Sequence, residues 1–104
     1  MTAQPDSTRE AATGEPAAVR VRYFAGARAA AGVAEETVRV APASPDAPVR
    51  AGDVLDAVLA AHGERLARVV AACSFLLNGV SARDRGTPVR DGDELDVLPP
   101  FAGG

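Results

Sequence analysis

The dipeptide Asn78-Gly79 is the strongest local constraint on how this chain folds. It directly follows the apolar run 75–77, which has the composition of a β-strand. A type I′ turn needs positive φ at both central positions, and asparagine and glycine adopt such values most readily. The sequence therefore predicts a strand that reverses at this dipeptide and a short strand that returns from Val80.

Three further strands follow from the alternation of apolar and polar side chains. Residues 19–24 and 36–41 both alternate with a period of two, which is typical of half-buried strands. A last strand is expected over 94–98, after an Asp-Gly turn, with Leu95 and Val97 on its inner face. These strands need a covering layer on the apolar face of the sheet.

The spacing of apolar residues predicts helices that can form this covering layer. Four apolar residues recur at helical spacing before Gly63, namely Val54, Leu55, Val58 and Leu59. A second helical piece follows with Leu66, Val69 and Val70 inward, and the Ala-rich stretch 25–31 predicts a helical turn closed by Gly32. The order of elements predicts an α+β fold with a β-grasp arrangement, which is a mixed sheet of four to five strands with one main helix across one face.

Length and composition limit the chain to one small domain. At 104 residues and 47% hydrophobic residues, the chain can form one core. Residues 1–18 have no apolar period and are expected to form a disordered N-terminal extension, before a β-grasp domain over 19–98 and a flexible tail over 99–104. The sequence has no signal peptide and no stretch long enough to span a membrane, so we expect a cytoplasmic protein without membrane contact.

The charged residues argue against binding to nucleic acid. The net charge is -3 and aromatic residues make up 4% of the chain. Nucleic-acid binders are expected to have a basic patch and aromatic side chains on which the bases can stack. All 11 basic residues are arginine. Codon usage in a GC-rich genome explains this bias, but its consequence is chemical, because a chain without lysine cannot be joined to itself through side-chain isopeptide bonds.

The sequence offers no catalytic or metal-binding set. Cys73 is the single cysteine and lies between apolar segments, which favours a small core residue over a reactive thiol. His62 is the single histidine and precedes Gly63 at an expected helix end, where it can face the negative end of the helix dipole. Because no nucleophile–base pair can be assembled, we expect a substrate of enzymes and not an enzyme, with no bound metal and no bound cofactor.

The last six residues, 99–104, have the chemistry of an acyl carrier. Pro99 and Pro100 fix φ and remove two backbone donors, which favours a stiff exit from the folded body. Gly103 and Gly104 have no Cβ, so this end can enter a narrow channel. A terminal carboxylate is ionised at neutral pH and can attack the α-phosphate of ATP to give an acyl-adenylate.

Several separated segments resemble the MoaD/ThiS family of ubiquitin-like sulfur carriers. These segments are Val21-Arg22-Tyr23-Phe24-Ala25-Gly26-Ala27-Arg28, Gly52-Asp53-Val54-Leu55, Leu77-Asn78-Gly79, Asp91-Gly92-Asp93-Glu94-Leu95, and Pro99-Pro100 with the glycines. They cover about residues 19–104, and their order together with the Gly-Gly ending carries the resemblance.

The resemblance implies a function and two partners. In this family an ubiquitin-activating-like adenylyltransferase uses ATP to adenylate the C-terminal glycine, which is then converted to a thiocarboxylate. Gly104 is the residue that would carry the sulfur. For molybdenum cofactor synthesis, the acceptor resembles the large subunit of molybdopterin synthase, which would hold the catalytic residues.

Strand parity suggests where these partners dock. If Leu95 and Val97 face inward, Leu98 faces outward, and Phe24 does so by the same parity. The first and last strands of a β-grasp fold are neighbours, so Phe24, Leu98 and Phe101 are expected to form an apolar patch at the root of the tail. The predicted partner-binding residues are Phe24, Leu98, Pro99, Pro100, Phe101 and Ala102. Ser81 departs from the family, which often has a larger apolar residue there.

The acidic residues near the last turn have a plain interpretation. Asp91, Asp93, Glu94 and Asp96 could suggest a cation site, but carboxylates on a tight turn are usually solvated. A salt-steered contact with a basic partner is the favoured hypothesis for this run.

Two other functions remain open at the level of sequence. In one, Gly104 forms an isopeptide bond with a target lysine, as in a ubiquitin-like protein modifier. In the other, the sulfur goes to thiamin, cysteine or a sulfur-containing natural product. The Phe-Ala-Gly-Gly tail after Pro-Pro and the Tyr-Phe-Ala of the first strand favour molybdopterin synthesis.

Overall fold

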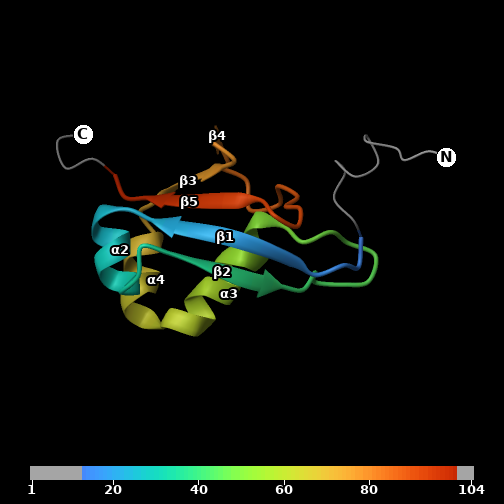
Figure 1. The fold of residues 1–104 in the computed structure, drawn as a ribbon, viewed down its shortest axis with the longest axis horizontal. Coiled ribbons are helices and arrows are strands. Elements are labelled where there is room, and N and C mark those ends of the chain that lie inside the picture. Colours follow the sequence, from blue (N-terminus) through green and yellow to red (C-terminus); the bar gives the residue numbers. More distant parts are fainter. Residues whose placement is uncertain (1–12, 101–104) are drawn as a thin grey trace.

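A mixed five-stranded sheet forms the centre of the computed structural model, which describes residues 13–100 (Figure 1). The elements in chain order are β1 (Ala17–Tyr23), α2 (Ala25–Ala31), β2 (Glu35–Val40), α3 (Ala51–His62), α4 (Glu64–Val70), β3 (Ser74–Leu77), β4 (Val80–Ser81) and β5 (Glu94–Leu98). The strands lie in the order β2-β1-β5-β3-β4. The predicted α+β, ubiquitin-like β-grasp fold is confirmed.

Strand β5 occupies the middle of the sheet. It pairs parallel with β1, with Tyr23 opposite Val97, and antiparallel with β3, with Phe75 opposite the same valine. The first and last strands are therefore neighbours, as the β-grasp prediction requires. Because β5 is held on both sides, the segment that follows Leu98 leaves from a fixed point.

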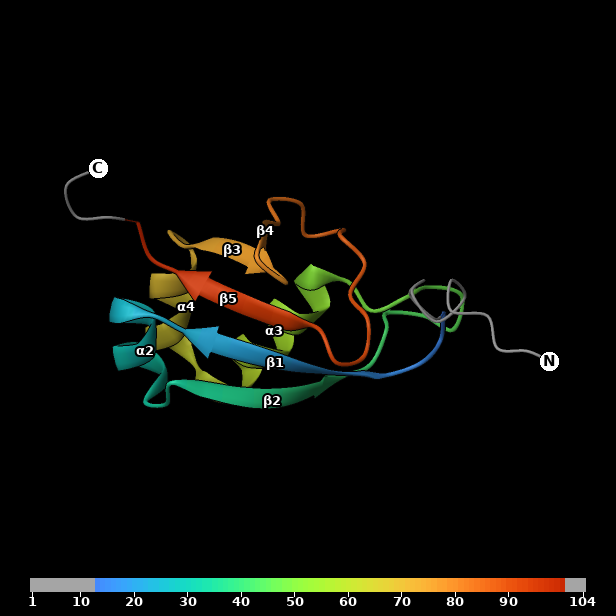
Figure 2. The ribbon, with the colours of Figure 1, turned by 45° about the horizontal axis from the view of Figure 1, so that its top comes forward.

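The helices cover one face of the sheet, and none of the helices in residues 13–100 lies on the other face (Figure 2). The inward side chains alternate along the strands as predicted, and Leu95 and Val97 are both 0% exposed. Helix α3 contributes Val54, Leu55 and Val58 to this core, and α4 contributes Leu66 and Val70. The predicted second helical piece is thus a separate short helix, α4. Another short helix, α2, lies at the end of the same layer.

Three turns have the backbone geometry that their residues predict. Asn78 and Gly79 have φ of 51° and 84°, so both central positions of the β3–β4 hairpin are in the left-handed region. Gly32 ends α2 with φ 81°, and Gly63 ends α3 with φ 87°. These glycines set the ends of the elements at the predicted places.

Strand β1 begins earlier than the domain boundary placed at residue 19. Ala17 is already part of the strand and is 3% exposed, and it pairs with Val40 of β2. Before the strand, the backbone N–H of Gly14 donates to the carbonyl of Ala47 at 2.8 Å. Alanine is too small to give a clear apolar period, so the sequence pattern placed the start of the strand at residue 19 and not at Ala17. The rest of the predicted extension, residues 1–12, lies outside the described residues.

Candidate functional site

The root of the C-terminal tail is the meeting point of β5 and the end of β1. The backbone N–H of Phe24 donates to the carbonyl of Val97 at 3.2 Å, which holds Phe24 beside Leu98. Figures 1 and 2 show the chain leaving the sheet here, at the end where β1 passes into α2. Pro99 is half-buried and Pro100 is exposed. Phe101, Ala102, Gly103 and Gly104 lie outside the described residues.

Phe24 and Leu98 lie on the outer face of the sheet, as strand parity predicts. Phe24 is 36% exposed and Leu98 is half-buried, whereas their neighbours Tyr23 and Val97 are 2% and 0% exposed. The two side chains are therefore available at the root of the tail. Phe101, the third predicted member of this patch, falls outside the described residues.

Leu76 of β3 extends this apolar surface and was missed by the sequence analysis. It pairs with Asp96, which has the outward parity of Leu98, and it is half-buried. The period of two in strand β3 could have placed it outward once Phe75 and Leu77 were assigned to the core. We refer to Phe24, Leu76 and Leu98 together as the outer apolar patch.

A ladder of charged pairs runs beside the outer apolar patch. Arg22 donates from Nε and Nη2 to the two carboxylate oxygens of Asp96 at 2.8 and 3.0 Å, and its Nη2 lies 3.5 Å from Glu94. This hydrogen-bonded pair with Asp96 raises the pKa of Arg22 above its ordinary value. The guanidinium carbon lies 5.5 Å from the centroid of the Phe24 ring, so Arg22 also supports the aromatic side of the patch.

The acidic run at the start of β5 is solvated only in part. Asp91 is exposed and Glu94 is half-buried, whereas Asp93 and Asp96 are 8% and 6% exposed and are bound within the domain. Asp93 accepts from Asn78 Nδ2 at 3.0 Å and from the backbone N–H of Arg90 at 2.8 Å, and Asp91 accepts from the backbone N–H of Ala18 at 2.8 Å. Asp91 and Asp93 therefore build the turn that leads into β5.

A small cavity lies next to Phe24. Its volume is about 260 Å³, and it is lined by Arg22, Tyr23, Phe24, Ala25, Arg28, Ala34 and Glu35. Ala25 turns the chain from β1 into α2 with φ 48°, in the left-handed region where a residue with a Cβ is strained. The cavity gives the outer apolar patch a concave border on the side of α2.

Two polar side chains, Glu36 and His62, hold Tyr23 from the inner side. Its hydroxyl donates to Glu36 Oε2 at 2.5 Å, and His62 Nε2 lies 2.5 Å from the same oxygen, with the two rings edge to face at 5.9 Å. Burial by itself raises the pKa of Glu36, but the hydrogen bonds from Tyr23 and His62 outweigh it, so the pKa is lowered from 4.5. Burial, followed by the bond to Glu36, raises the pKa of Tyr23. His62 ends α3 as expected, and its partner is this carboxylate.

The single cysteine packs against the core from its border, whereas the sequence predicted a residue of the core itself. Cys73 is half-buried against the core, and its thiol donates to the carbonyl of Val69 at 3.1 Å. Burial raises the pKa of this thiol, which disfavours the reactive thiolate. Within residues 13–100, no group of three or more metal-ligating side chains comes together.

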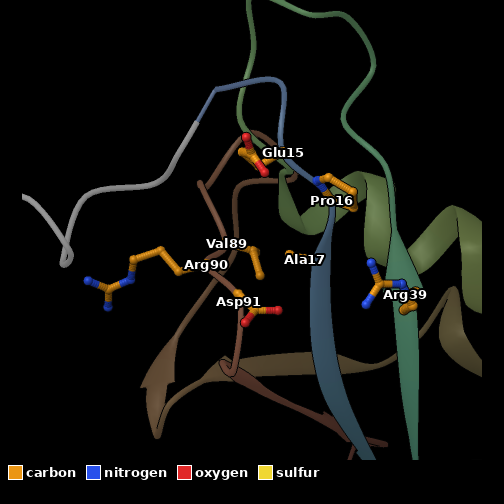
Figure 3. Close-up of a pocket in the computed structure, with 7 residues that line it drawn as sticks. All are labelled: Glu15, Pro16, Ala17, Arg39, Val89, Arg90 and Asp91. Carbon is orange, nitrogen blue, oxygen red and sulfur yellow. The ribbon is translucent and has the colours of Figure 1, made fainter.

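A second and wider cavity lies at the opposite end of β1 (Figure 3). It has a volume of about 620 Å³ and is lined by Glu15, Pro16, Ala17, Arg39, Val89, Arg90 and Asp91. Arg39 and Asp91 extend toward it from β2 and from the turn before β5. Its border carries both signs of charge, so it favours neither an anion nor a cation.

Comparison with known proteins identifies the family. The family model of ThiS matches residues 21–104, which includes every element after the first residues of β1 and the glycine ending. The chain belongs to the ThiS family. This agrees with the resemblance drawn from the sequence segments and with the β-grasp sheet.

Similar proteins have names of two kinds, namely a sulfur carrier subunit and SAMP1, a small archaeal modifier protein. The molybdopterin synthase sulfur carrier subunit of Chlamydomonas reinhardtii is 34% identical over 87 residues, which cover 83% of this chain and 98% of that protein. The crystal structure of SAMP1 from Haloferax volcanii is also 34% identical, with a TM-score of 0.65, over 84% of this chain and 99% of that one. A complex of subunits 1 and 2 of molybdopterin-converting factor from Helicobacter pylori contains a chain 28% identical, with a TM-score of 0.55, over 84% and 99% of the two chains.

In the described part of this ThiS-family chain, no helix combines the length and the apolar character that crossing a membrane requires.

Proposed function

We propose that this protein is the small, sulfur-carrying subunit of a molybdopterin synthase. The observation that carries the proposal is the position of the C-terminal segment at the end of the central strand. Strand β5, held between β1 and β3, ends at Leu98 beside Phe24 and directly precedes Pro99, Pro100 and the Gly-Gly ending. A similar chain that is named a molybdopterin synthase sulfur carrier subunit supports the choice of pathway.

The chemistry resides at Gly104. Its carboxylate attacks the α-phosphate of ATP, pyrophosphate leaves, and an acyl-adenylate forms. A sulfur nucleophile then displaces AMP and leaves a thiocarboxylate on the glycine. Gly103 and Gly104 suit this step because neither has a Cβ that would block a narrow active-site channel. The activating enzyme binds the ATP, so this chain needs no cofactor of its own.

The outer apolar patch serves as the docking surface for two partners in turn. The first is an ubiquitin-activating-like adenylyltransferase, and the second is the large subunit of molybdopterin synthase, which supplies the catalytic groups. The Helicobacter pylori complex, in which a similar chain is joined to its subunit 2, supports the second partner. Phe24 and Leu98 are the anchors, while Pro99 to Ala102 thread the tail toward the partner's active site.

Intact-mass spectrometry tests this proposal. The chain is co-expressed with its activating enzyme and a sulfur donor, and the expected product has one oxygen exchanged for one sulfur. The purified thiocarboxylate is then incubated with the large subunit and the pterin precursor, and the sulfur should be consumed. A chain that stays a carboxylate, while a known carrier treated in parallel is converted, would contradict the proposal.

A protein-modifier role is the second candidate, because small archaeal modifier protein 1 from Haloferax volcanii is as similar in sequence as the sulfur carrier subunit. In that role Gly104 forms an isopeptide bond with a lysine of another protein. Immunoblots of cells that express the tagged chain distinguish the two functions. A ladder of conjugates that disappears when Gly104 is deleted supports the modifier role, and its absence beside a thiocarboxylate supports the carrier role.

A further inference from the structure

Strand β2 is an open edge of the sheet. Within residues 13–100 it pairs with β1 alone, and Figure 2 shows it along the border opposite β3 and β4. With six residues, Glu35–Val40, it is much longer than β4, which forms the other edge with two. A long open edge presents unpaired backbone donors and acceptors, and these are a template for pairing with another strand.

The pairing with β1 fixes which backbone groups point to this edge. The N–H of Tyr23 donates toward β2, to Ala34, whereas the N–H of Arg20 donates toward β5, to Asp93. The residues of β1 that face β2 are therefore Val19, Val21 and Tyr23, and their partners in register include Glu36 and Val38. The alternate residues of β2, which are Glu35, Thr37 and Arg39, direct their N–H and C=O groups to the open side.

These three residues also carry a self-complementary pattern of charge. Their side chains are exposed and share the outer face of the sheet, in the order acidic, neutral, basic. Arg39 makes no side-chain hydrogen bond or ion pair within residues 13–100. Glu35 makes none in that range either, and it lies opposite Arg22, whose guanidinium is bound to Asp96.

We infer that β2 pairs antiparallel with β2 of a second copy of this chain. Centring the two-fold axis on Thr37 places Glu35 of each copy opposite Arg39 of the other. In this register the three residues of each copy that face the open edge, Glu35, Thr37 and Arg39, lie opposite one another, so about six backbone hydrogen bonds form across it. Two opposite-charge cross-strand pairs add to them.

The register centred on Thr37 is favoured because the neighbouring registers lose either the opposite-charge pairs or the backbone hydrogen bonds. A shift that places Thr37 opposite Arg39, or opposite Glu35, keeps the hydrogen-bond parity but leaves no charged pair of opposite sign. A shift by a single residue brings Glu36 and Val38 against the edge residues, although their backbone groups already face β1. The antiparallel register centred on Thr37 satisfies both requirements.

The pairing would join two five-stranded sheets into one continuous sheet. Because the two copies run in opposite directions, their β5 strands end at opposite ends of the combined sheet. Phe24 directly follows β1 and Leu98 ends β5, so neither lies on the β2 edge, and both outer apolar patches stay open. Self-association and docking of a partner at the tail are thus compatible.

Sedimentation velocity over a concentration series tests the inference with the full chain. Wild-type protein should dimerise weakly, with a Kd of about 10 μM to 1 mM, as expected of a small interface. Glu35→Arg opposes arginine to arginine, and Arg39→Glu opposes glutamate to glutamate. Each variant should weaken self-association by about tenfold or more.

Mixing the two variants tests whether Glu35 of one copy lies opposite Arg39 of the other. Glu35→Arg and Arg39→Glu are complementary to each other in the proposed register, so an equimolar mixture should associate as a heterodimer, and the double variant E35R/R39E should recover self-association. Thr37→Pro removes an N–H that faces the open edge and should abolish dimerisation, with circular dichroism as the check of fold. A wild-type chain that stays monomeric at millimolar concentration, or a dimer unaffected by both charge reversals, would overturn the inference. An edge that pairs only with a strand of another protein would do so as well.

Discussion

Substitutions at neighbouring positions, in β5 and just after β1, distinguish an effect on docking from an effect on folding. Leu98→Asp and Phe24→Asp place a charge on the outer face and should weaken binding to the large subunit by about 2 kcal/mol or more, with a change in folding stability of about 0.5 kcal/mol or less. Val97→Asp, at 0% exposure, buries an unpaired charge and should unfold the domain. Titration calorimetry and thermal melting of the three variants check this contrast, and equal unfolding by Leu98→Asp would count against an exposed patch.

The shared carboxylate of Glu36 predicts a dependence of stability on pH. Because the pKa of Glu36 is lower in the folded chain than the ordinary 4.5, its ionised form stabilises the fold above that pH. That contribution is lost as the pH falls through the lowered pKa. Glu36→Gln should therefore destabilise the domain by about 1 to 2 kcal/mol at neutral pH, and the difference should shrink as the pH falls below 4.5 and through the lowered pKa.

Chemical denaturation of both proteins across the acidic range measures that difference. Asp56→Asn is a suitable control, because Asp56 is exposed and its partner Arg85 is exposed as well. An exposed ion pair of this kind contributes little, so the control should follow the wild-type curve. A constant difference between Glu36→Gln and wild type at every pH would rule out ionisation as the source.

At the scale of elements, the β3–β4 hairpin depends on contacts with β5. Asn78 adopts φ 51°, donates from Nδ2 to Asp93, and accepts from the backbone N–H of Glu94 at 2.9 Å. Asn78→Ala loses both side-chain bonds and the tolerance of positive φ, so it should destabilise the domain by about 1 to 3 kcal/mol. Val80→Thr, in the same hairpin at 69% exposure, should be nearly neutral. Equal melting temperatures for the two variants would contradict this role of Asn78.

The elements themselves were predictable because their signals are local. The Asn-Gly turn, the glycines at helix ends and the period of two in β1 and β5 each depend on a few adjacent residues. The burial of Asp96 was not predictable, because its partner Arg22 lies 74 residues away in sequence. The cluster of Tyr23, Glu36 and His62 is likewise assembled only by the fold. Local pattern thus indicated faces and turns, while polar pairings between distant strands needed the structure.

At the scale of the whole molecule, the fold separates the packed sheet from the end of the chain that we propose to be reactive. The core side chains nearest to that end are Leu95 and Val97, and the last described residue, Pro100, is exposed. Phe24, Leu98 and the last described residue, Pro100, therefore lie at one end of the molecule, although Phe24 is far from the other two in sequence. This arrangement suits a carrier, because its reactive group can enter a partner while the body stays docked.

Removing Gly104, or adding one residue after it, should abolish sulfur transfer and leave the melting temperature unchanged. The reason is that thiocarboxylation needs a terminal glycine carboxylate at the right reach, whereas no described core contact involves a residue beyond Val97. Mass spectrometry after co-expression reads the first effect, and calorimetry reads the second. Binding of the truncated chain to the large subunit serves as the control, since Phe24 and Leu98 are retained. A truncated chain that melts well below the parent would show instead that the tail packs against the body.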